Sequence, residues 1–102
     1  MASSKEYLDF VLESLADIDG ISFRAMMGEY IIYLDGKVIG GIYDDRFLLK
    51  PTKSALAMMP DAKRELPYDG AGEMLLADVE DRALMRELLP KMYGEVPGSK
   101  RK

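Results

Sequence analysis

The fold is decided by residues 29–43, which read EYIIYLDGKVIGGIY. Two short apolar runs, rich in isoleucine, valine and tyrosine, flank Asp35-Gly36. Residues of this kind favour strands, and an Asp-Gly pair between two such runs indicates a two-residue hairpin turn. The stretch therefore predicts an antiparallel hairpin with strands at 29–34 and 37–43.

The hairpin extends on both sides into a longer antiparallel meander. Two further strand-like runs, at 21–27 and 46–50, are separated from it by Gly28 and by Asp44-Asp45. Glycine and aspartate at these breaks favour turns. A last apolar run at 74–77 is short enough to be one more strand.

Helices are predicted before and after the meander. Ser3 followed by Glu6 forms a capping box ahead of apolar residues at helical spacing, so a first helix should span about residues 4–17. Thr52 can cap a short second helix through Met59, because a threonine oxygen accepts from the first free backbone amides.

The last predicted helix is capped by Asp78 and must bend or end at Pro90, because proline lacks the amide hydrogen that an α-helix needs. The expected fold class is α+β in two layers, with an antiparallel meander of about four to five strands packed with three helices. We expect a single domain over 1–93 and a flexible basic tail over 94–102, since 102 residues suffice for one core.

The charge distribution argues against nucleic-acid binding. Without Lys100, Arg101 and Lys102, the 14 basic residues fall to 11 against 18 acidic ones, which leaves a net charge of about −7 on residues 1–99. A polyanion requires a clustered positive surface. No apolar run approaches the ~18 residues of a membrane span and no signal peptide is recognisable, so we expect a cytoplasmic protein with no membrane contact.

The sequence offers little to an enzyme. It contains no histidine and no cysteine, which excludes the usual general base, thiolate nucleophiles and the usual zinc ligands. Asp17-Ile18-Asp19-Gly20 resembles the start of a calcium loop, but the glycine comes at the fourth position instead of the sixth. Asp44-Asp45 is better explained as a turn. We therefore expect no enzymatic activity, no cofactor and no metal.

Two other features point to packing. Gly40-Gly41 lies inside a strand pattern, which predicts the close approach of another backbone or a bulky neighbour. Methionine is abundant, and adaptable core filling is the favoured interpretation; it applies to Met26, Met27, Met58, Met59, Met74, Met85 and Met92.

Both faces of the predicted sheet are apolar, because neighbouring positions such as Ile32 and Tyr33 point to opposite sides of a strand. One face is expected to pack on the helices. The other is expected to be covered by a second copy of the chain through Tyr33 and Tyr43, unless the C-terminal helix covers it. Phe10 lies about 120° from the apolar stripe of the first helix, so it either covers the edge of the core or contacts a partner.

The segment from residue 24 to residue 50 resembles the N-terminal domain family of TfoX, also called Sxy, a bacterial regulator of competence genes. The pattern is Arg-x-Met-Met-Gly, a tyrosine-rich strand, Asp-Gly-Lys, an apolar strand, then Asp-Asp before a second apolar strand that ends in lysine. The residues that carry it are Arg24, Met26, Gly28, Tyr30, Asp35, Gly36, Asp45 and Lys50.

The resemblance implies a stand-alone regulatory or protein-interaction module that acts with the transcription machinery through protein contacts. It supplies no catalytic residues. Two alternatives stay open at the level of sequence: a small-ligand-binding domain with a pocket beside Arg24 and Lys50, and a metal-dependent enzyme that uses carboxylates.

Overall fold

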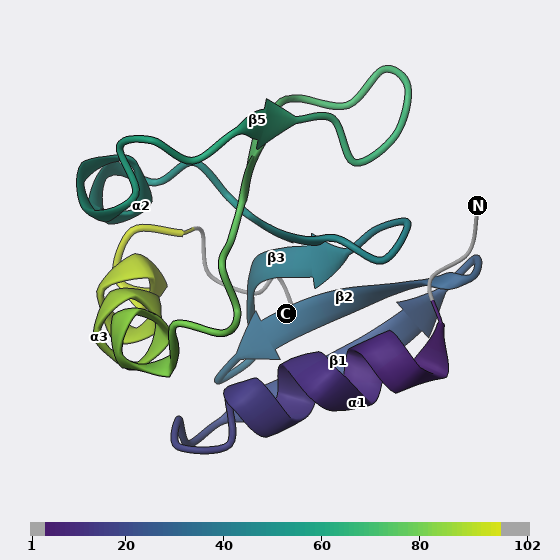
Figure 1. Ribbon diagram of the computed structural model, residues 1–102, viewed down its shortest axis with the longest axis horizontal. Helices are drawn as coiled ribbons and strands as arrows, with labels where there is room; N and C mark the ends of the chain where they lie inside the picture. The colour runs from purple at the N-terminus through teal and green to yellow at the C-terminus, as the bar shows by residue number, and fades with distance from the viewer. Residues whose placement is uncertain (1–3, 97–102) are drawn as a thin grey trace.

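The computed structural model describes residues 4–96 and shows an antiparallel sheet with helices packed on one face (Figure 1). The elements in chain order are α1 (Lys5–Ser14), β1 (Ile21–Met26), β2 (Glu29–Leu34), β3 (Lys37–Ile42), β4 (Phe47–Leu49), α2 (Lys53–Met58), β5 (Arg64–Glu65), β6 (Met74–Leu76) and α3 (Arg82–Tyr93). The spatial order of the strands is β1-β2-β3-β4-β6-β5. The predicted α+β class is confirmed, with six strands instead of four to five.

The central hairpin forms as its sequence predicts. Asp35 and Gly36 have φ angles of 49° and 85°, the left-handed conformation that both residues of a type I′ turn require. The turn before it is of the same kind, since Met27 and Gly28 have φ angles of 53° and 87°. Both turns join strands that pair directly, β1 with β2 and β2 with β3.

The two central glycines permit a close strand contact, as the sequence predicts. A β-carbon on Gly40 would lie 2.2 Å from the carbonyl oxygen of Leu48, and one on Gly41 would lie 2.6 Å from the ring of Tyr43. The pairing of β2 with β3 also shifts by one residue between Ile32 and Tyr33. This bulge adds an extra residue to β3 just before Gly40.

The core lies between one face of the sheet and the helices. It includes Leu8, Val11 and Leu15 of α1, and Met85, Leu88, Leu89 and Met92 of α3. From the sheet it includes Ile32, Leu34, Ile39, Ile42, Phe47, Leu49 and Leu75. Helix α3 packs on β2 and β3, and α2 packs on α3. The two layers predicted from the sequence are therefore present.

Two helix predictions need correction. The N-cap of α1 is Ser4 and not Ser3, and that of α3 is Asp81 and not Asp78. Asp78 instead accepts a hydrogen bond from the amide of Glu80, which forms a turn before the helix. The sequence predicts that Pro90 bends or ends α3; it does not end the helix, which continues to Tyr93.

The C-terminal side of the domain differs from the prediction in two places. Strand β5, which pairs with β6, was not expected. Val96 is buried in the core, and the carboxylate of Glu95 accepts hydrogen bonds from the amide and hydroxyl of Ser54 at 2.9 and 2.5 Å. The folded part therefore reaches at least Val96, into the predicted tail; the rest of that tail, 97–102, lies outside the described residues.

Candidate functional site

The sheet face that points away from the helices, called here the open face, carries the strongest candidate for a site. Side chains alternate along each strand, so the residues next to core positions point to the open face. The cross-strand pairs Ser22–Tyr33, Arg24–Ile31 and Met26–Glu29 of β1 and β2 point to this face. Leu48 of β4 is fully buried, yet it is absent from the helix-side core cluster. The open face therefore carries large apolar side chains among a few polar ones, and part of it is covered.

An apolar hollow of about 490 Å³ lies at one end of the open face. Its lining residues come from the β1–β2 hairpin, from the end of β3 and from the loop that precedes β6: Met26, Met27, Glu29, Ile31, Tyr43, Pro67 and Tyr68. Three large apolar side chains around it are exposed to water, Met26 at 48%, Met27 at 97% and Tyr68 at 64%. A cluster of exposed apolar residues around a concavity is typical of a binding surface.

The loop over the open face is held by Arg46. Its guanidinium forms a salt bridge with Glu65 and donates a hydrogen bond to the carbonyl of Leu66 at 3.3 Å. The same guanidinium donates to the carbonyl of Tyr43 at 3.1 Å. One arginine thus ties the start of the loop, which carries Tyr68, to the turn between β3 and β4.

The rings of Tyr43 and Tyr68 lie between the apolar hollow beside Met27 and a second hollow. Their ring centroids lie 6.3 Å apart, with the rings tilted by 56°. The second hollow, of about 340 Å³, is lined by both rings and by Val38, Gly40, Lys50, Pro51, Pro67, Ala71, Gly72, Glu73 and Met74. Burial raises the pKa of the Tyr43 hydroxyl, and the negative charge of Glu29 adds to the effect. At neutral pH this hydroxyl is protonated and can donate a hydrogen bond.

The structure brings together only two of the three predicted interface residues. Tyr33 and Tyr43 are both half-buried on the open face. Phe10 is 40% exposed but lies on α1, which belongs to the helical layer. The centroid of its ring is 6.0 Å from that of the Tyr7 ring. These residues cannot form one continuous surface.

The prediction of core filling is correct for some methionines and wrong for two. Met85 and Met92 are fully buried and Met59 nearly so, whereas Met26 and Met27 are exposed. Met27 and Tyr68 were therefore missed as surface candidates. The predicted strand 21–27 includes Met27, but this residue lies in the turn after β1; a residue directly before Gly28 was the available signal, since a two-residue turn position lies outside any strand face.

Most of the family motif builds the fold. Asp35 and Gly36 form a turn, and Lys37 after them donates to the carbonyl of Tyr93 at 3.0 Å, 4.1 Å above the ring centroid of the same tyrosine. Asp45 accepts a hydrogen bond from the amide of Ser4 at 2.8 Å, which positions the start of α1.

The other motif residues divide into two groups. Tyr30 packs against the core and against Phe23, and the backbone amide of Lys50 donates to the carbonyl of Ile39 at 3.0 Å. Arg24 and Met26 are exposed on β1, so their side chains contribute little to folding. Lys50 lines the second hollow, but Arg24 does not, because β2 and β3 lie between them. The pocket predicted beside Arg24 and Lys50 is therefore not a single site.

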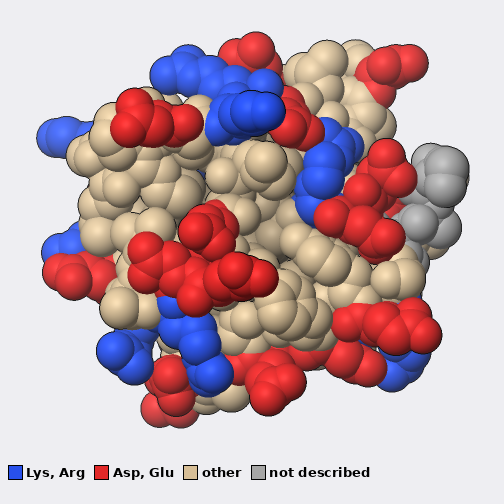
Figure 2. Space-filling model, viewed as in Figure 1, with Lys and Arg blue, Asp and Glu red and all other residues tan. Residues whose placement is uncertain are grey.

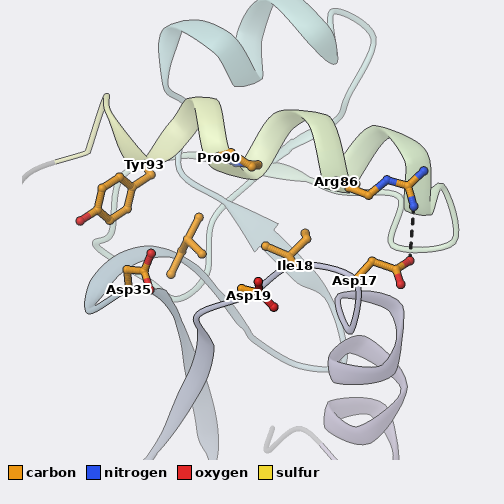
Figure 3. Close-up of a pocket in the computed structure, with 8 residues that line it drawn as sticks. Asp17, Ile18, Asp19, Asp35, Arg86, Pro90 and Tyr93 are labelled. Carbon is orange, nitrogen blue, oxygen red and sulfur yellow. Dashed lines mark hydrogen bonds and ion pairs between the residues drawn. The ribbon is translucent and has the colours of Figure 1, made fainter.

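A third hollow, of about 280 Å³, lies at the opposite end of the sheet (Figure 3). It contains three aspartates, Asp17, Asp19 and Asp35, with Arg86 beside Asp17. The carboxylate of Asp17 lies 3.4 Å from the guanidinium groups of both Arg82 and Arg86. Among residues 4–96 no group of three or more acidic side chains is arranged to hold a metal ion. We interpret this hollow as the junction between α3 and the turns that precede β1 and β3.

The molecular surface mixes both signs of charge. On the face shown in Figure 2, acidic side chains lie among the basic ones. None of the helices within the described part of the chain is long and apolar enough to cross a bilayer.

Comparison with known proteins identifies a family. The family model of the TfoX N-terminal domain matches residues 13–96. An uncharacterised 12.7 kDa protein from the region 5′ of trpE in Spirochaeta aurantia is 32% identical over 102 residues, which cover 98% of this chain and 89% of the relative. No solved structure matches.

Proposed function

This chain belongs to the TfoX N-terminal domain family, and we propose that it is a regulatory protein-interaction module that binds a protein partner of the transcription machinery through its open face. The observation that carries the proposal is the apolar hollow beside Met27, whose side chain is 97% exposed. The proposal assigns no catalytic reaction to the chain.

Met27 is a poor choice for folding alone. Its φ angle of 53° lies in the left-handed region, which asparagine, aspartate and glycine adopt more readily than methionine does. The side chain also gains no burial, so it contributes almost nothing to the hydrophobic stabilisation of the monomer. Its position at the mouth of an apolar hollow supports a role in contacting another molecule.

The hollow suits a protein side chain. Methionine is flexible and polarisable, which allows Met26 and Met27 to adapt to an apolar group that enters between them and Tyr68. Aromatic residues and methionine are enriched in the buried centres of protein interfaces. The Tyr43 hydroxyl next to the hollow can donate a hydrogen bond to a backbone carbonyl of the partner.

Affinity purification from the source organism, with proteins identified by mass spectrometry, tests the proposal. The Met27→Asp variant removes the apolar side chain but keeps a residue that accepts the turn conformation. We expect the wild type to retain a component of the transcription machinery and Met27→Asp to lose at least about tenfold of it, as for a residue at the centre of an interface. Direct binding of the purified partner should show the same loss.

Phe10→Asp is the matched control, because it also replaces an exposed apolar residue with aspartate but lies in the helical layer. It should retain the partner. Loss of the partner with Phe10→Asp but not with Met27→Asp would move the contact to α1 and contradict the proposed surface. Retention of proteins unrelated to transcription would contradict the proposed role.

A further inference from the structure

Strand β1 is an exposed edge of the sheet. It pairs only with β2 among the strands of the described residues, and five of its six residues, from Ser22 to Met26, are exposed. It contains no proline and only one charged residue, Arg24. The other edge, β5, is two residues long and consists of Arg64 and Glu65. Short, charged edge strands prevent pairing with other chains, whereas a long, regular edge invites it.

The geometry of the β1–β2 hairpin shows which backbone groups of β1 point outward. In a two-residue hairpin, the residues that flank the turn, Met26 and Glu29, exchange backbone hydrogen bonds. Because the pattern alternates, Ser22 and Arg24 also point their backbone groups toward β2. The amides and carbonyls of Ile21, Phe23 and Ala25 therefore point away from the sheet and can pair with another strand.

An apolar hollow follows the same edge on the helical side. It measures about 480 Å³ and lies between α1 and β1, which run beside each other in Figure 1. The lining residues are Leu12, Leu15, Ala16, Ile21, Ser22 and Phe23. The Phe23 ring is 46% exposed at this border. A partner strand on β1 that carries an apolar side chain at this level would cover the hollow and the ring together.

We propose that two copies of this chain pair through β1, antiparallel, with Phe23 on the two-fold axis. The two-fold axis of such a dimer is perpendicular to the sheet, because residues that pair across antiparallel strands point to the same face. One residue of β1 then lies on the axis and pairs with the same residue of the second copy. An axis at Phe23 pairs Ile21 with Ala25 of the second copy and Ser22 with Arg24 of the second copy. The outward-pointing amides and carbonyls then meet one another.

Charge selects this register over the one with the axis at Arg24. An axis at Arg24 would place two arginines directly opposite each other, which is unfavourable for like charges on paired strands. The axis at Phe23 places each arginine opposite a serine and brings two phenylalanine rings together, and aromatic pairs across strands are favourable. Each ring also lies next to the hollow lined by Leu12 and Leu15 of its own copy. This inference does not depend on the proposed function of the open face.

The chain has no cysteine, so a single introduced thiol can test the register. In the proposed dimer, the α-carbons of the two copies of residue 23 are ~5.5 Å apart, within the range of a disulfide. We expect Phe23→Cys to form an intermolecular disulfide under mild oxidation. Arg24→Cys is the control for register, and Met27→Cys is the control for random collisions, since Met27 is almost fully exposed at the turn.

The outcomes separate the possibilities. Cross-linking that is at least about tenfold faster for Phe23→Cys than for both controls supports the proposal, because only an opposed pair has the required geometry. Faster cross-linking of Arg24→Cys overturns the register, and equal rates overturn pairing through β1. Because a cysteine could itself weaken the interface, the wild type is measured separately by analytical ultracentrifugation. A monomeric wild type at high micromolar concentration would also overturn the proposal. Pairing of β1 with a strand of another protein, instead of a second copy, would overturn it as well.

Discussion

The close contact at Gly40 allows a quantitative test of the fold. In a Gly40→Ala variant, the new methyl group would lie 2.2 Å from the carbonyl oxygen of Leu48 and 3.0 Å from the α-carbon of Leu49. Both atoms belong to the backbone of β4, which cannot move aside as a flexible side chain could. Relief of the clash requires β3 and β4 to separate, and this strains the hydrogen bond from the amide of Lys50 to the carbonyl of Ile39 at 3.0 Å.

We expect Gly40→Ala to lower the free energy of unfolding by about 3 kcal/mol, the upper part of the usual range for overpacking. Urea denaturation followed by far-ultraviolet circular dichroism measures it. With a slope of about 2 kcal/mol per M, the midpoint should fall by about 1.5 M.

Gly72→Ala is the matched control. A β-carbon there meets no atom within 4 Å, and Gly72 does not have a positive φ angle. This variant should unfold at or slightly above the urea midpoint of the wild type, because alanine reduces the entropy of the unfolded chain. If the Gly40→Ala midpoint lies within the error of the Gly72→Ala midpoint, the tight approach of β3 and β4 is refuted.

Three further predictions follow from the same structure. Pro90→Ala should change stability by no more than about 1 kcal/mol, because α3 already continues past this exposed proline; a large fall in the thermal midpoint would show that the proline fixes the helix. Hydrogen bonds from Ser54 lower the pKa of Glu95 below 4.5, so Ser54→Ala should raise it in an NMR titration. The pKa of Glu95 is lower in the folded state than in the unfolded state, so its ionised form stabilises the fold. The wild type should lose this contribution to the free energy of unfolding as the pH falls through the folded-state pKa, and Ser54→Ala should lose less. Finally, gel shifts near physiological salt should show no specific binding of duplex DNA; a salt-sensitive complex that survives deletion of residues 98–102 would contradict the charge argument.

The sequence predicts the local parts of the fold well and the non-local parts poorly. The turn at Asp35-Gly36 depends only on neighbouring residues of the chain, and it forms as predicted. Thr52 caps α2 as expected. Strand β5 has only the two charged residues Arg64 and Glu65, with no apolar alternation to reveal it. It forms because β6 lies beside it, which depends on the path of the whole chain. The caps of α1 and α3 were misassigned because each start offers several capping residues within a short distance.

The candidate site was predicted only in part for a related reason. Alternation along a strand shows which residues share a face, and it correctly groups Tyr33 with the open face. It does not show whether a strand lies in the centre of a sheet or at its edge, and this position decides the exposure of Met26. The contribution of Tyr68 depends on a loop that Arg46 holds over the sheet, a contact between distant parts of the chain.

The two proposed surfaces are compatible, because they use opposite sides of β1. Pairing of two copies uses the outer backbone edge, with Phe23 on the helical side, while Met26 points to the open face and lines the hollow. In a dimer the two open faces would join side by side, so a partner with two binding segments could contact both copies and bind more tightly than one segment alone. Met27→Asp should therefore weaken partner binding at least about tenfold and leave the dimer intact, as judged by analytical ultracentrifugation. Phe23→Lys should give a folded monomer whose open face still binds the partner, but more weakly. If Phe23→Lys abolished partner binding completely while circular dichroism stayed unchanged, the two surfaces would not be separate, and β1 itself would be part of the partner site.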